Sequence, residues 1–348
     1  MGSGQLSDEL SGVGTRSAEM PHVAIVIVCW NNAAIIGETL QSVAAQRYPG
    51  DRLHTYVVDN GSSDQSLALV SELLPDATIV DLQWNSGFAV ANNVGIRRAR
   101  AEHPLSYVVL LNSDATLPRD WVSSMVGFAM TRPRGACFQS LTVDGLNPER
   151  VDSTHLVVDQ SLQARQASYG EPVGAGHRTQ RVFGVNAAAA LYSVAFFEAQ
   201  PFDDILDERM WMYLEDVDLS ARALVMGWEN WTVAGAPARH LGSASTKQRA
   251  GGFAIRQTMR NQPILWLTNF PVTMLIKAIP SIVRHDRGAI NHLRSTNQRG
   301  VIPELLKGRF EGIAMIPYAM GRRRQLRPHV RVAPEGLGVF MTTGTLQL

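Results

Sequence analysis

The chain has 348 residues, and apolar residues make up 45% of it, so it can bury a sizeable core in one large domain or two smaller ones. Its two cysteines, Cys29 and Cys137, lie far apart in apolar runs, which excludes a disulfide scaffold or a cysteine-based zinc site and favours a reducing compartment. The net charge of +1 hides an asymmetry, because from Lys247 onward 16 Lys and Arg face 4 Asp and Glu, a net +12, and the preceding part carries −11.

The first 21 residues are rich in Gly and Ser and hold no apolar run. A secretory signal peptide requires an apolar core, so residues 1–21 are expected to be a disordered leader rather than a signal peptide. The folded part of the chain is expected to begin near residue 22.

Strand-like and helix-like segments then alternate over the first third of the chain. The run VAIVIVCW (23–30) is continuously apolar and β-branched, which is typical of a strand buried on both faces. Further strands are predicted at 53–60, 77–82 and 106–112, with helices starting near Ile36, over 63–74 and over 89–101. This alternation predicts a mostly parallel sheet with helices on both faces, in which ligands bind beyond the carboxyl ends of the strands.

Two carboxylates stand where predicted strands end. Asp59 ends the second strand in VVDNGSSD, and Asp114 follows the fourth in YVVLLNSDATLP, so both should open onto the same edge of the sheet. By itself, Asp59-Asn60-Gly61 is more often a tight turn, for which these residue types are favoured. The first strand leads into CWNNAA (29–34), without the glycines of a dinucleotide fingerprint or a P-loop. A bound diphosphate would then need another source of positive charge, and a divalent cation held by Asp114 would supply it.

The segment WNSGFAVANNVGIRRA (84–99) is interpreted as a loop that enters a helix. Gly87 would permit an unusual backbone angle or a close approach, and Asn85, Asn92 and Asn93 offer amide donors and acceptors. The alternative interpretation is capping of the helix by Asn85 and Ser86.

The segment MYLEDVDLSARALVMGW (212–228) predicts a short helix over 214–226 that begins with two adjacent acids, Glu215 and Asp216. The helix dipole favours negative charge at this end, so the plain interpretation is a charge bias. The functional interpretation is that one of the two carboxylates is a general base within reach of a substrate hydroxyl.

Helix geometry distinguishes the two acids, because successive positions point about 100° apart. Position 215 shares a face with Asp218 and Arg222, which we expect to pair on the helix surface. Position 216 falls instead beside Ser220 and Ala223, whose small side chains would leave room for a substrate. Asp216 is therefore the expected base.

These segments occur in an order and spacing that resembles the family 2 glycosyltransferases, and most closely their bacterial rhamnosyltransferase-like subgroup. The matching segments, within about 22–246, are VAIVIVCWNN, VVDNGSSD, NSGFAVANNVGI, LLNSDA, FGVNAAAALY, FDDILDERMWMYLEDVDLSARALVMGW and ARHLGSAS. The resemblance implies a GT-A fold, which is a Rossmann-like α/β architecture, with a nucleotide-sugar half over about 22–116 and an acceptor half over about 117–246. Residues 247–348 would form a basic, mainly helical C-terminal extension.

The resemblance also implies roles for individual residues in an inverting transfer from a nucleoside diphosphate sugar. Asp216 would be the general base, with Glu215 beside it. Residues expected to contact the donor are Asn31, Asp59, Asn60, Asn85, Gly87, Asn92, Asn112, Ser113 and Asp114, and those near the sugar or acceptor are Gly184, Asn186, Trp211 and Tyr213. Asp114 would hold Mg²⁺ or Mn²⁺ on the diphosphate, and His240, which by itself is more often a packing residue than a ligand, would complete that metal site.

The chain departs from many members of this family at the metal motif. They carry Asp-x-Asp where this chain has Asn112-Ser113-Asp114. A neutral Asn is the weaker metal ligand, but rhamnosyltransferase-like members often show this form. The resemblance therefore implies dTDP-rhamnose as the donor ahead of UDP- or GDP-sugars.

The basic C-terminal extension holds the apolar run ILWLTNFPVTMLIKAIPSIV (264–283), which is nearly long enough to cross a bilayer. Pro271, Lys277 and Pro280 interrupt it, so we expect no membrane span. Amphipathic helices flanked by arginines suit the surface of an anionic membrane. The arginines expected to meet lipid phosphate are Arg322, Arg323 and Arg324. The alternatives are a helical subdomain packed on the body or a homodimer contact, and nucleic acid is not an expected partner because no recognisable nucleic-acid module accompanies the charge.

The expected function is transfer of a sugar to a hydroxyl of a lipid-linked or cell-envelope glycan, by a cytoplasmic enzyme peripheral to the inner face of the cell membrane. Two rivals share the fold. A nucleotidyltransferase that makes sugar nucleotides would need a Gly-rich loop bearing Lys or Arg after the first strand, and CWNNAA is neither. A non-catalytic sugar-binding or scaffold protein would have no need of Asp59, Asp114 and the Glu215-Asp216 pair.

Overall fold

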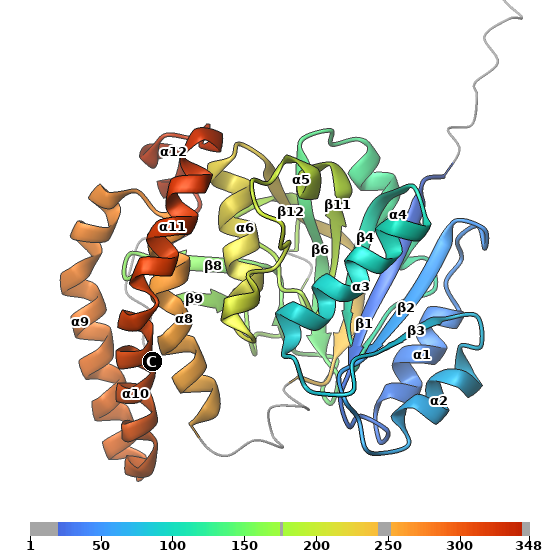
Figure 1. Cartoon of the computed structure of the whole chain (residues 1–348), viewed down its shortest axis with the longest axis horizontal. Helices are drawn as coiled ribbons and strands as arrows, with labels where there is room; N and C mark the ends of the chain where they lie inside the picture. The colour runs from blue at the N-terminus through green and yellow to red at the C-terminus, as the bar shows by residue number, and fades with distance from the viewer. Residues whose placement is uncertain (1–19, 175–176, 243–251, 343–348) are drawn as a thin grey trace, which may run out of the picture.

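The computed structural model describes residues 20–174, 177–242 and 252–342 (Figure 1). Most of the leader expected over 1–21 lies outside these ranges. In the part that is described, the strands of one large sheet and their covering helices run from residue 22 to residue 240, and helices dominate from residue 253 onward.

The centre of the large sheet is β1 (His22–Cys29), which lies between β2 (Leu53–Asp59) and β4 (Leu105–Asn112) and runs parallel to both. Successive β1 side chains alternate between two buried clusters, one on each face of the sheet. Burial on both faces is the reason why this strand has a continuous apolar run instead of an alternating one. The predicted strand and its parallel setting are confirmed.

The large sheet has further strands on both sides of this centre. They are β3 (Thr78–Asp81), β5 (Ala115–Thr116), β6 (Gly135–Asp144), β7 (Val151–Ser153), β10 (Gln180–Val182), β11 (Ala189–Ser193) and β12 (Glu229–His240). The main order is β10-β12-β6-β11-β4-β1-β2-β3, with β11 antiparallel to both neighbours. A smaller sheet consists of β8 (Leu156–Asp159), β9 (Ala164–Gln166) and β13 (Met341–Thr342).

Helices cover both faces of the large sheet. One face packs against α1 (Ile36–Ala44), α2 (Ser66–Leu73) and α4 (Trp121–Met130). The other face packs against α3 (Phe88–Glu102), α5 (Val194–Ala199) and α6 (Glu215–Val225). The predicted fold class, a mostly parallel α/β sheet with flanking helices, is confirmed.

The C-terminal helices stand at one end of the molecule, away from β3, α1 and α2 (Figure 1). They are α8 (Phe253–Asn269), α9 (Val272–Ser295), α10 (Ile302–Ala314), α11 (Ile316–Leu326) and α12 (Pro334–Gly338). Ile264, Leu265 and Trp266 of α8 belong to the same buried cluster as α3 and α6, and β13 pairs with β8. The extension thus shares a core with the body. In the described part of the chain, no helix is both long and apolar enough to cross a membrane.

The expectation that three arginines meet lipid phosphate is wrong for Arg322. Its side chain is buried and pairs with Asp204 at 2.8 Å and with Asp207 at 3.0 Å. Arg323 donates hydrogen bonds to the main-chain carbonyls of Leu267 in α8 and of Phe270 directly after it. The carboxylates compensate the desolvation of the buried arginine, so these contacts hold α11 against the rest of the protein. Of the three arginines, Arg324 is the exposed one.

Candidate active site

A cavity of about 380 Å³ lies at the carboxyl ends of β1, β2 and β4. Its wall includes residues from both halves of the body and Thr258 of α8. Ten residues singled out in the sequence line it, namely Asn60, Asn85, Asn112, Ser113, Asp114, Asn186, Tyr213, Glu215, Asp216 and His240. The cavity is therefore the candidate active site.

The strand register explains why these residues converge. Asp59 lies opposite the last residue of β1, and Asn112 lies opposite the residue before it. The loops after three parallel strands thus meet at a single edge, as the sequence predicts. Hydrogen bonds then tie the loops together, and the Ser113 hydroxyl donates to Asn32 Oδ1 at 3.0 Å.

Asn60 shapes the loop that enters α3. Its Oδ1 accepts hydrogen bonds from the backbone N–H and the hydroxyl of Ser86, at 2.8 and 2.9 Å, and its Nδ2 donates to the Gly87 carbonyl at 3.3 Å. Gly87 has a φ of 88°, and a Cβ there would lie 2.5 Å from the indole of Trp211. Both reasons predicted for a glycine here, an unusual backbone angle and a close approach, therefore apply.

Six other predicted residues lie off the cavity wall, namely Asn31, Asp59, Gly87, Asn92, Gly184 and Trp211. Asp59 Oδ2 accepts a hydrogen bond from the backbone N–H of Ser62 at 3.0 Å, in the turn that its sequence favours. Asn92 donates to the Phe88 carbonyl at 2.9 Å within α3. These two side chains hold local structure next to the site, and direct contact of the six residues with a substrate stays a prediction.

His240, at the end of β12, lies between two carboxylates. Its Nε2 is 3.3 Å from Asp114 Oδ1, its Nδ1 is 3.1 Å from Asp152 Oδ2, and all three side chains are buried. Burial works against charge on the imidazole, but the hydrogen bonds and charges of the two carboxylates outweigh it and raise the pKa of His240 to about 10. The ring is therefore protonated at neutral pH. Sequence reasoning missed Asp152, because it stands in a three-residue strand that carries no motif.

Asn112, Asp114 and His240 form a donor set that fits a divalent cation. Asn112 Oδ1 is buried without a hydrogen-bond partner among the described residues, and Asn112 Nδ2 lies 3.3 Å from His240 Nε2. Carboxylate and amide oxygens suit Mg²⁺ and Mn²⁺, and a neutral imidazole is a further ligand in protein sites. His240 would release its proton on binding a metal, because only the neutral ring can be a ligand.

Glu215 and Asp216 begin α6 at the cavity wall. Of the 11 residues of this helix, all of which are described, Asp216 is the one that is not fully buried. Its Oδ1 accepts a hydrogen bond from the N–H of Val217 at 2.8 Å, and its Oδ2 accepts one from the N–H of Ala187 at 3.3 Å. Glu215 is buried, and its Oε2 has no hydrogen-bond partner within the described chain.

The two carboxyl groups differ in pKa because their burial is compensated differently. Burial, with the nearby charge of Asp216 added to it, raises the pKa of Glu215 to about 8. Burial also raises the pKa of Asp216, but backbone N–H groups offset part of it, so that the value is about 6. At pH 7, Asp216 is thus the ionised member of the pair and Glu215 the protonated one.

The loop before α6 has an uncommon backbone conformation. Trp211, Tyr213 and Leu214 have positive φ angles of 64°, 71° and 70°, which cost energy in residues that carry a Cβ. Asn261 of α8 holds this loop, because its Nδ2 donates to three carbonyls between residues 210 and 213, at 2.8 to 2.9 Å. Sequence reasoning missed Asn261, since no local pattern links it to a loop so far upstream.

Asp218 and Arg222 pair as expected, but the expectation that the pair lies on the helix surface is wrong. Both side chains are 0% exposed, with Arg222 Nε 2.9 Å from Asp218 Oδ2. The reason is that Asn269 of α8 covers Asp218, donating from Nδ2 to Oδ1 at 2.6 Å. The segment before α6 covers Arg222, whose guanidinium donates to the Ile205 carbonyl at 2.6 Å. Ser220, expected to leave room for a substrate, instead packs so closely that a Cβ on Gly184 would lie 2.5 Å from the Ser220 Cβ.

A mostly parallel sheet with helices on both faces and a cavity at the carboxyl ends of its strands is the GT-A fold, and solved structures share this fold. The structure of S. aureus TarS 1-349 in complex with UDP has a TM-score of 0.53 and 16% identity, covering 87% of this chain and 91% of that one. The mannosyltransferase PcManGT from Pyrobaculum calidifontis, in complex with GDP-Man and Mn²⁺, has a TM-score of 0.52 and 18% identity, covering 85% and 88%.

Residues 24–199, just over half of the chain, match glycosyl transferase family 2, and the chain belongs to this family. Poly-beta-1,6-N-acetyl-D-glucosamine synthase of Staphylococcus epidermidis is 25% identical over 221 residues, 62% of this chain and 49% of the relative. The same synthase of Staphylococcus aureus (strain COL) is 26% identical over 215 residues, 61% of this chain and 46% of the relative. The chain thus spans about half the length of the curated relatives it matches.

The match places a family 2 glycosyltransferase domain in this chain. The resemblance seen in the sequence is confirmed at the level of the family. The relatives and structures named above are not rhamnosyltransferases, so the finer assignment to a rhamnosyltransferase-like subgroup gains no support from them.

Proposed function

We propose that this chain is an inverting glycosyltransferase that moves a hexosyl group from a nucleoside diphosphate sugar to an acceptor hydroxyl. The observation that carries the proposal is that one cavity joins a possible set of cation ligands, Asn112, Asp114 and His240, to a carboxyl pair, Glu215 and Asp216. The first set can neutralise a diphosphate, and the second can take a proton. Sugar transfer from a diphosphate to a hydroxyl needs both.

The carboxyl edge of the sheet is the proposed donor site. Asn112, Asp114 and His240 would hold Mg²⁺ or Mn²⁺, which when bound supplies positive charge for the leaving diphosphate. Asn60 and Asn85 line the cavity at the ends of the neighbouring loops. The Asn60 amide is occupied by Ser86 and Gly87, so Asn60 would position the loop, and the Asn85 Nδ2 group would donate a hydrogen bond to the nucleoside.

Asp216 is the proposed general base. Its carboxylate takes the proton of the acceptor hydroxyl while the hydroxyl oxygen forms a bond to the anomeric carbon. The bond from that carbon to the diphosphate oxygen breaks, and its electron pair leaves with the diphosphate. Attack on the face opposite the leaving group inverts the anomeric configuration, as water does in an inverting hydrolase. Glu215, protonated at neutral pH, would donate a hydrogen bond instead of taking the proton.

The sugar and the acceptor are the finer part of the proposal. The sequence resemblance favours dTDP-rhamnose, whereas the solved structures named above contain UDP or GDP-Man. The curated relatives are named for an N-acetylglucosamine polymer. These names support a hexose donor and, as acceptor, a cell-envelope glycan or its lipid-linked precursor.

Release of nucleoside diphosphate tests this function. The purified chain is incubated with UDP-N-acetylglucosamine, GDP-mannose or dTDP-rhamnose, and we expect cleavage of one donor, faster when an acceptor glycan is added. EDTA and Asp114→Ala should each abolish the release, whereas Asp76→Ala, at an exposed aspartate off the cavity wall, should not. Full activity in EDTA would remove the metal from the proposal.

The same assay distinguishes the two rivals. Binding of a donor without turnover under any condition would favour a scaffold protein. Release of pyrophosphate from a nucleoside triphosphate and a sugar phosphate would favour a nucleotidyltransferase.

We further propose that the C-terminal extension lies against an anionic membrane surface, which would place the enzyme at the inner face of the cell membrane. Four apolar side chains of α9 recur at helical spacing on one face and are 45% to 62% exposed. They are Val272, Ile276, Ile279 and Val283. Lys277, Arg284 and Arg287 of the same helix are exposed as well.

α10 adds a second exposed apolar row, made of Leu306, Phe310 and Ile313, whose exposure is 53% to 75%. Apolar side chains next to exposed cations suit the head-group region of an anionic bilayer, where the helix buries its apolar face and each cation meets lipid phosphate. The charge of the extension supports a lipid occupant over a second copy of the chain, because two surfaces of the same positive sign repel each other.

A further inference from the structure

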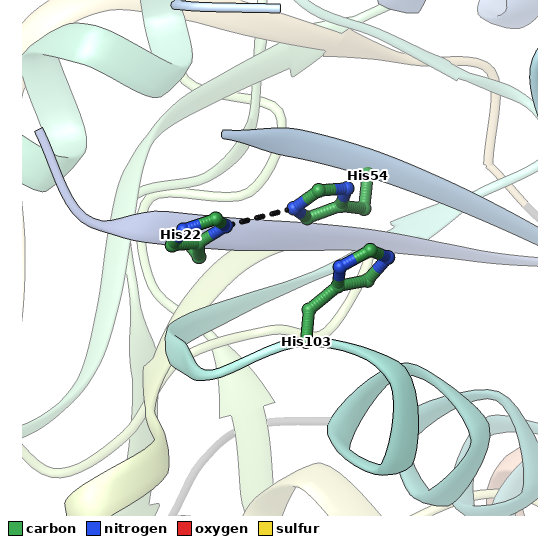
Figure 2. A group of neighbouring side chains, drawn as sticks. All are labelled: His22, His54 and His103. Carbon is green, nitrogen blue, oxygen red and sulfur yellow. Dashed lines mark hydrogen bonds between the residues drawn. The ribbon is translucent and has the colours of Figure 1, made fainter. Parts of the chain in front are cut away.

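Three histidines meet near the amino ends of β1 and β2, whereas the cavity lies at the carboxyl ends of these strands. Figure 2 shows the three side chains next to one another. His22 begins β1, His54 is the second residue of β2, and His103 follows the last residue of α3. β1 has 8 residues, and at about 3.3 Å per step it places this histidine cluster roughly 23 Å from the loops of the candidate active site. The cluster takes no part in the proposed transfer reaction.

The three imidazoles are close enough to share one ion. His22 Nδ1 is 3.0 Å from His54 Nε2, and the rings of His54 and His103 stack with their centroids 3.4 Å apart. One ring nitrogen from each residue lies within 4.8 Å of the other two. Nitrogens bound to a tetrahedral zinc ion at about 2.0–2.1 Å are roughly 3.3 Å from one another. Rotation of the side chains that turns the stacked rings, so that their in-plane nitrogen lone pairs point at one ion, would bring all three to ligand distance.

Packing alone is a weaker explanation of this arrangement. Aromatic rings prefer offset or edge-to-face contacts, whereas the His54 and His103 rings lie nearly parallel, at 8°, and close together. The three rings instead gather their nitrogens in one place, and the neutral imidazole is the form that binds metals.

We propose that His22, His54 and His103 bind a divalent transition-metal ion, with Zn²⁺ as the simplest candidate, at a site separate from that of Asp114. Imidazole nitrogen suits Zn²⁺, Ni²⁺ and Cu²⁺, whereas Mg²⁺ and Mn²⁺ prefer carboxylate, carbonyl and water oxygens. All three side chains are half-buried, so a water can take the fourth position on the ion. The two sites therefore select different classes of metal.

Such an ion would cross-link distant segments of the chain and stabilise the fold. It would join the start of β1, the start of β2 and the junction between α3 and β4, which are distant in the sequence. An ion that binds the folded chain and not the unfolded one stabilises the fold by mass action. Zinc is thus expected to raise the unfolding temperature and leave sugar transfer unchanged.

Zinc titration of the full-length, metal-free chain tests the site by calorimetry and thermal unfolding. We expect one ion per chain and, at zinc about 100-fold above its dissociation constant, an unfolding temperature raised by roughly 5 °C. His54→Asn should abolish both effects, and His292→Ala, at an exposed histidine of α9, should change neither. Asp114→Ala should keep both effects, which separates this site from the candidate active site, and Mg²⁺ should give neither effect in that variant.

Equal zinc stoichiometry and equal stabilisation in His54→Asn and in the unaltered chain, both folded before zinc is added, would overturn the proposal. His103→Asn is the second variant if His54→Asn fails to fold, and unchanged zinc binding there would overturn it equally. Binding of half an ion per chain with formation of a dimer would also overturn it, since the ion would then lie between two copies.

Discussion

At the scale of single residues, Glu215 and Asp216 carry the same functional group, and their surroundings alone separate their properties. Asp216 reaches the cavity and accepts backbone hydrogen bonds from Val217 and Ala187, which favour its ionised form. Glu215 is buried next to another carboxyl, which favours its neutral form. The pair thus offers one proton acceptor and one proton donor at neutral pH.

The Asp216→Asn substitution keeps the shape of the side chain and removes its basicity. We expect it to lower kcat by at least the ~10²-fold typical of losing a general base, with little change in donor affinity. The matched substitution Glu215→Gln should cost less, because a neutral Glu215 and a glutamine both donate hydrogen bonds. Single-turnover kinetics and donor calorimetry measure the two effects. Near-normal turnover in Asp216→Asn together with an inactive Glu215→Gln would reverse the assignment.

The pH dependence of turnover should report the raised pKa of Asp216. A general base must be ionised, so kcat should fall as the pH is lowered through about 6. An ordinary aspartate, with a pKa of about 3.9, would hold kcat nearly level to about pH 5. The kcat is measured from pH 4.5 to 8, with thermal unfolding at each pH as the control for loss of the fold. A level kcat down to pH 4.5 would contradict Asp216 as a base with a raised pKa.

At the scale of elements, the start of α6 is positioned by α8. The loop over residues 211–214 has backbone angles that are costly in isolation. It persists because Asn261 donates to the carbonyls of Met212 and Tyr213 within it and to that of Met210 just before it. Thr258 of the same helix lines the cavity. The basic extension is therefore a structural part of the candidate site.

Removing the Asn261 amide should loosen the start of α6. We expect Asn261→Ala to lower the free energy of unfolding by about 1–3 kcal/mol, because it leaves main-chain carbonyls without a donor. Because the carboxyl pair would then be displaced, kcat should fall by roughly 10- to 100-fold. Asn291→Ala, at an exposed asparagine of α9, is the control and should stay within about 0.5 kcal/mol. Denaturant unfolding and kcat measure both, and an unaltered kcat would limit Asn261 to stability.

At the scale of the whole molecule, the C-terminal extension and the family 2 domain share one hydrophobic core. α8 supplies Ile264 and Leu265 to the shared core, and α11 is fixed by the buried Arg322. Cutting the chain near residue 245 would expose that core, so truncation cannot isolate a membrane-binding tail. Substitutions on the exposed face of α9 leave the core intact and are the cleaner test.

Membrane contact predicts flotation with vesicles that contain phosphatidylglycerol and none with pure phosphatidylcholine. Ile276→Asp should abolish this binding, because it places a like charge among anionic lipids and removes apolar contact. Arg284→Gln should weaken it about fivefold, the equivalent of ~1 kcal/mol, and added salt should weaken it further.

Leu146→Asp is the matched control for vesicle flotation, since Leu146 is exposed in the body. Sedimentation reports the competing outcome. A dimer that dissociates in Ile276→Asp, without vesicle binding by the unaltered chain, would identify the α9 face as a contact between copies.

The sequence by itself determined the features that depend on near neighbours along the chain. Burial of β1 on both faces, the alternation of strands and helices, and the carboxylates at strand ends all follow from side-chain periodicity and turn chemistry. Gly87 could likewise be predicted, because a positive φ and a close approach both favour glycine. The carboxyl ends of the strands lie on the same side of the sheet because the strands pair in parallel.

Only the tertiary structure decided which distant segment covers or completes each of these features. Periodicity placed Asp218 and Arg222 on one face of α6, but the burial of Asp218 depends on Asn269 of α8, which is encoded far downstream, and that of Arg222 on the loop at Ile205. The pairing of His240 with Asp152, the hold of Asn261 on the loop before α6, and the meeting of three histidines likewise join segments that no local pattern relates. The physical reason is that a residue's solvation and partners are set by contacts across the fold, which a single sequence window does not contain.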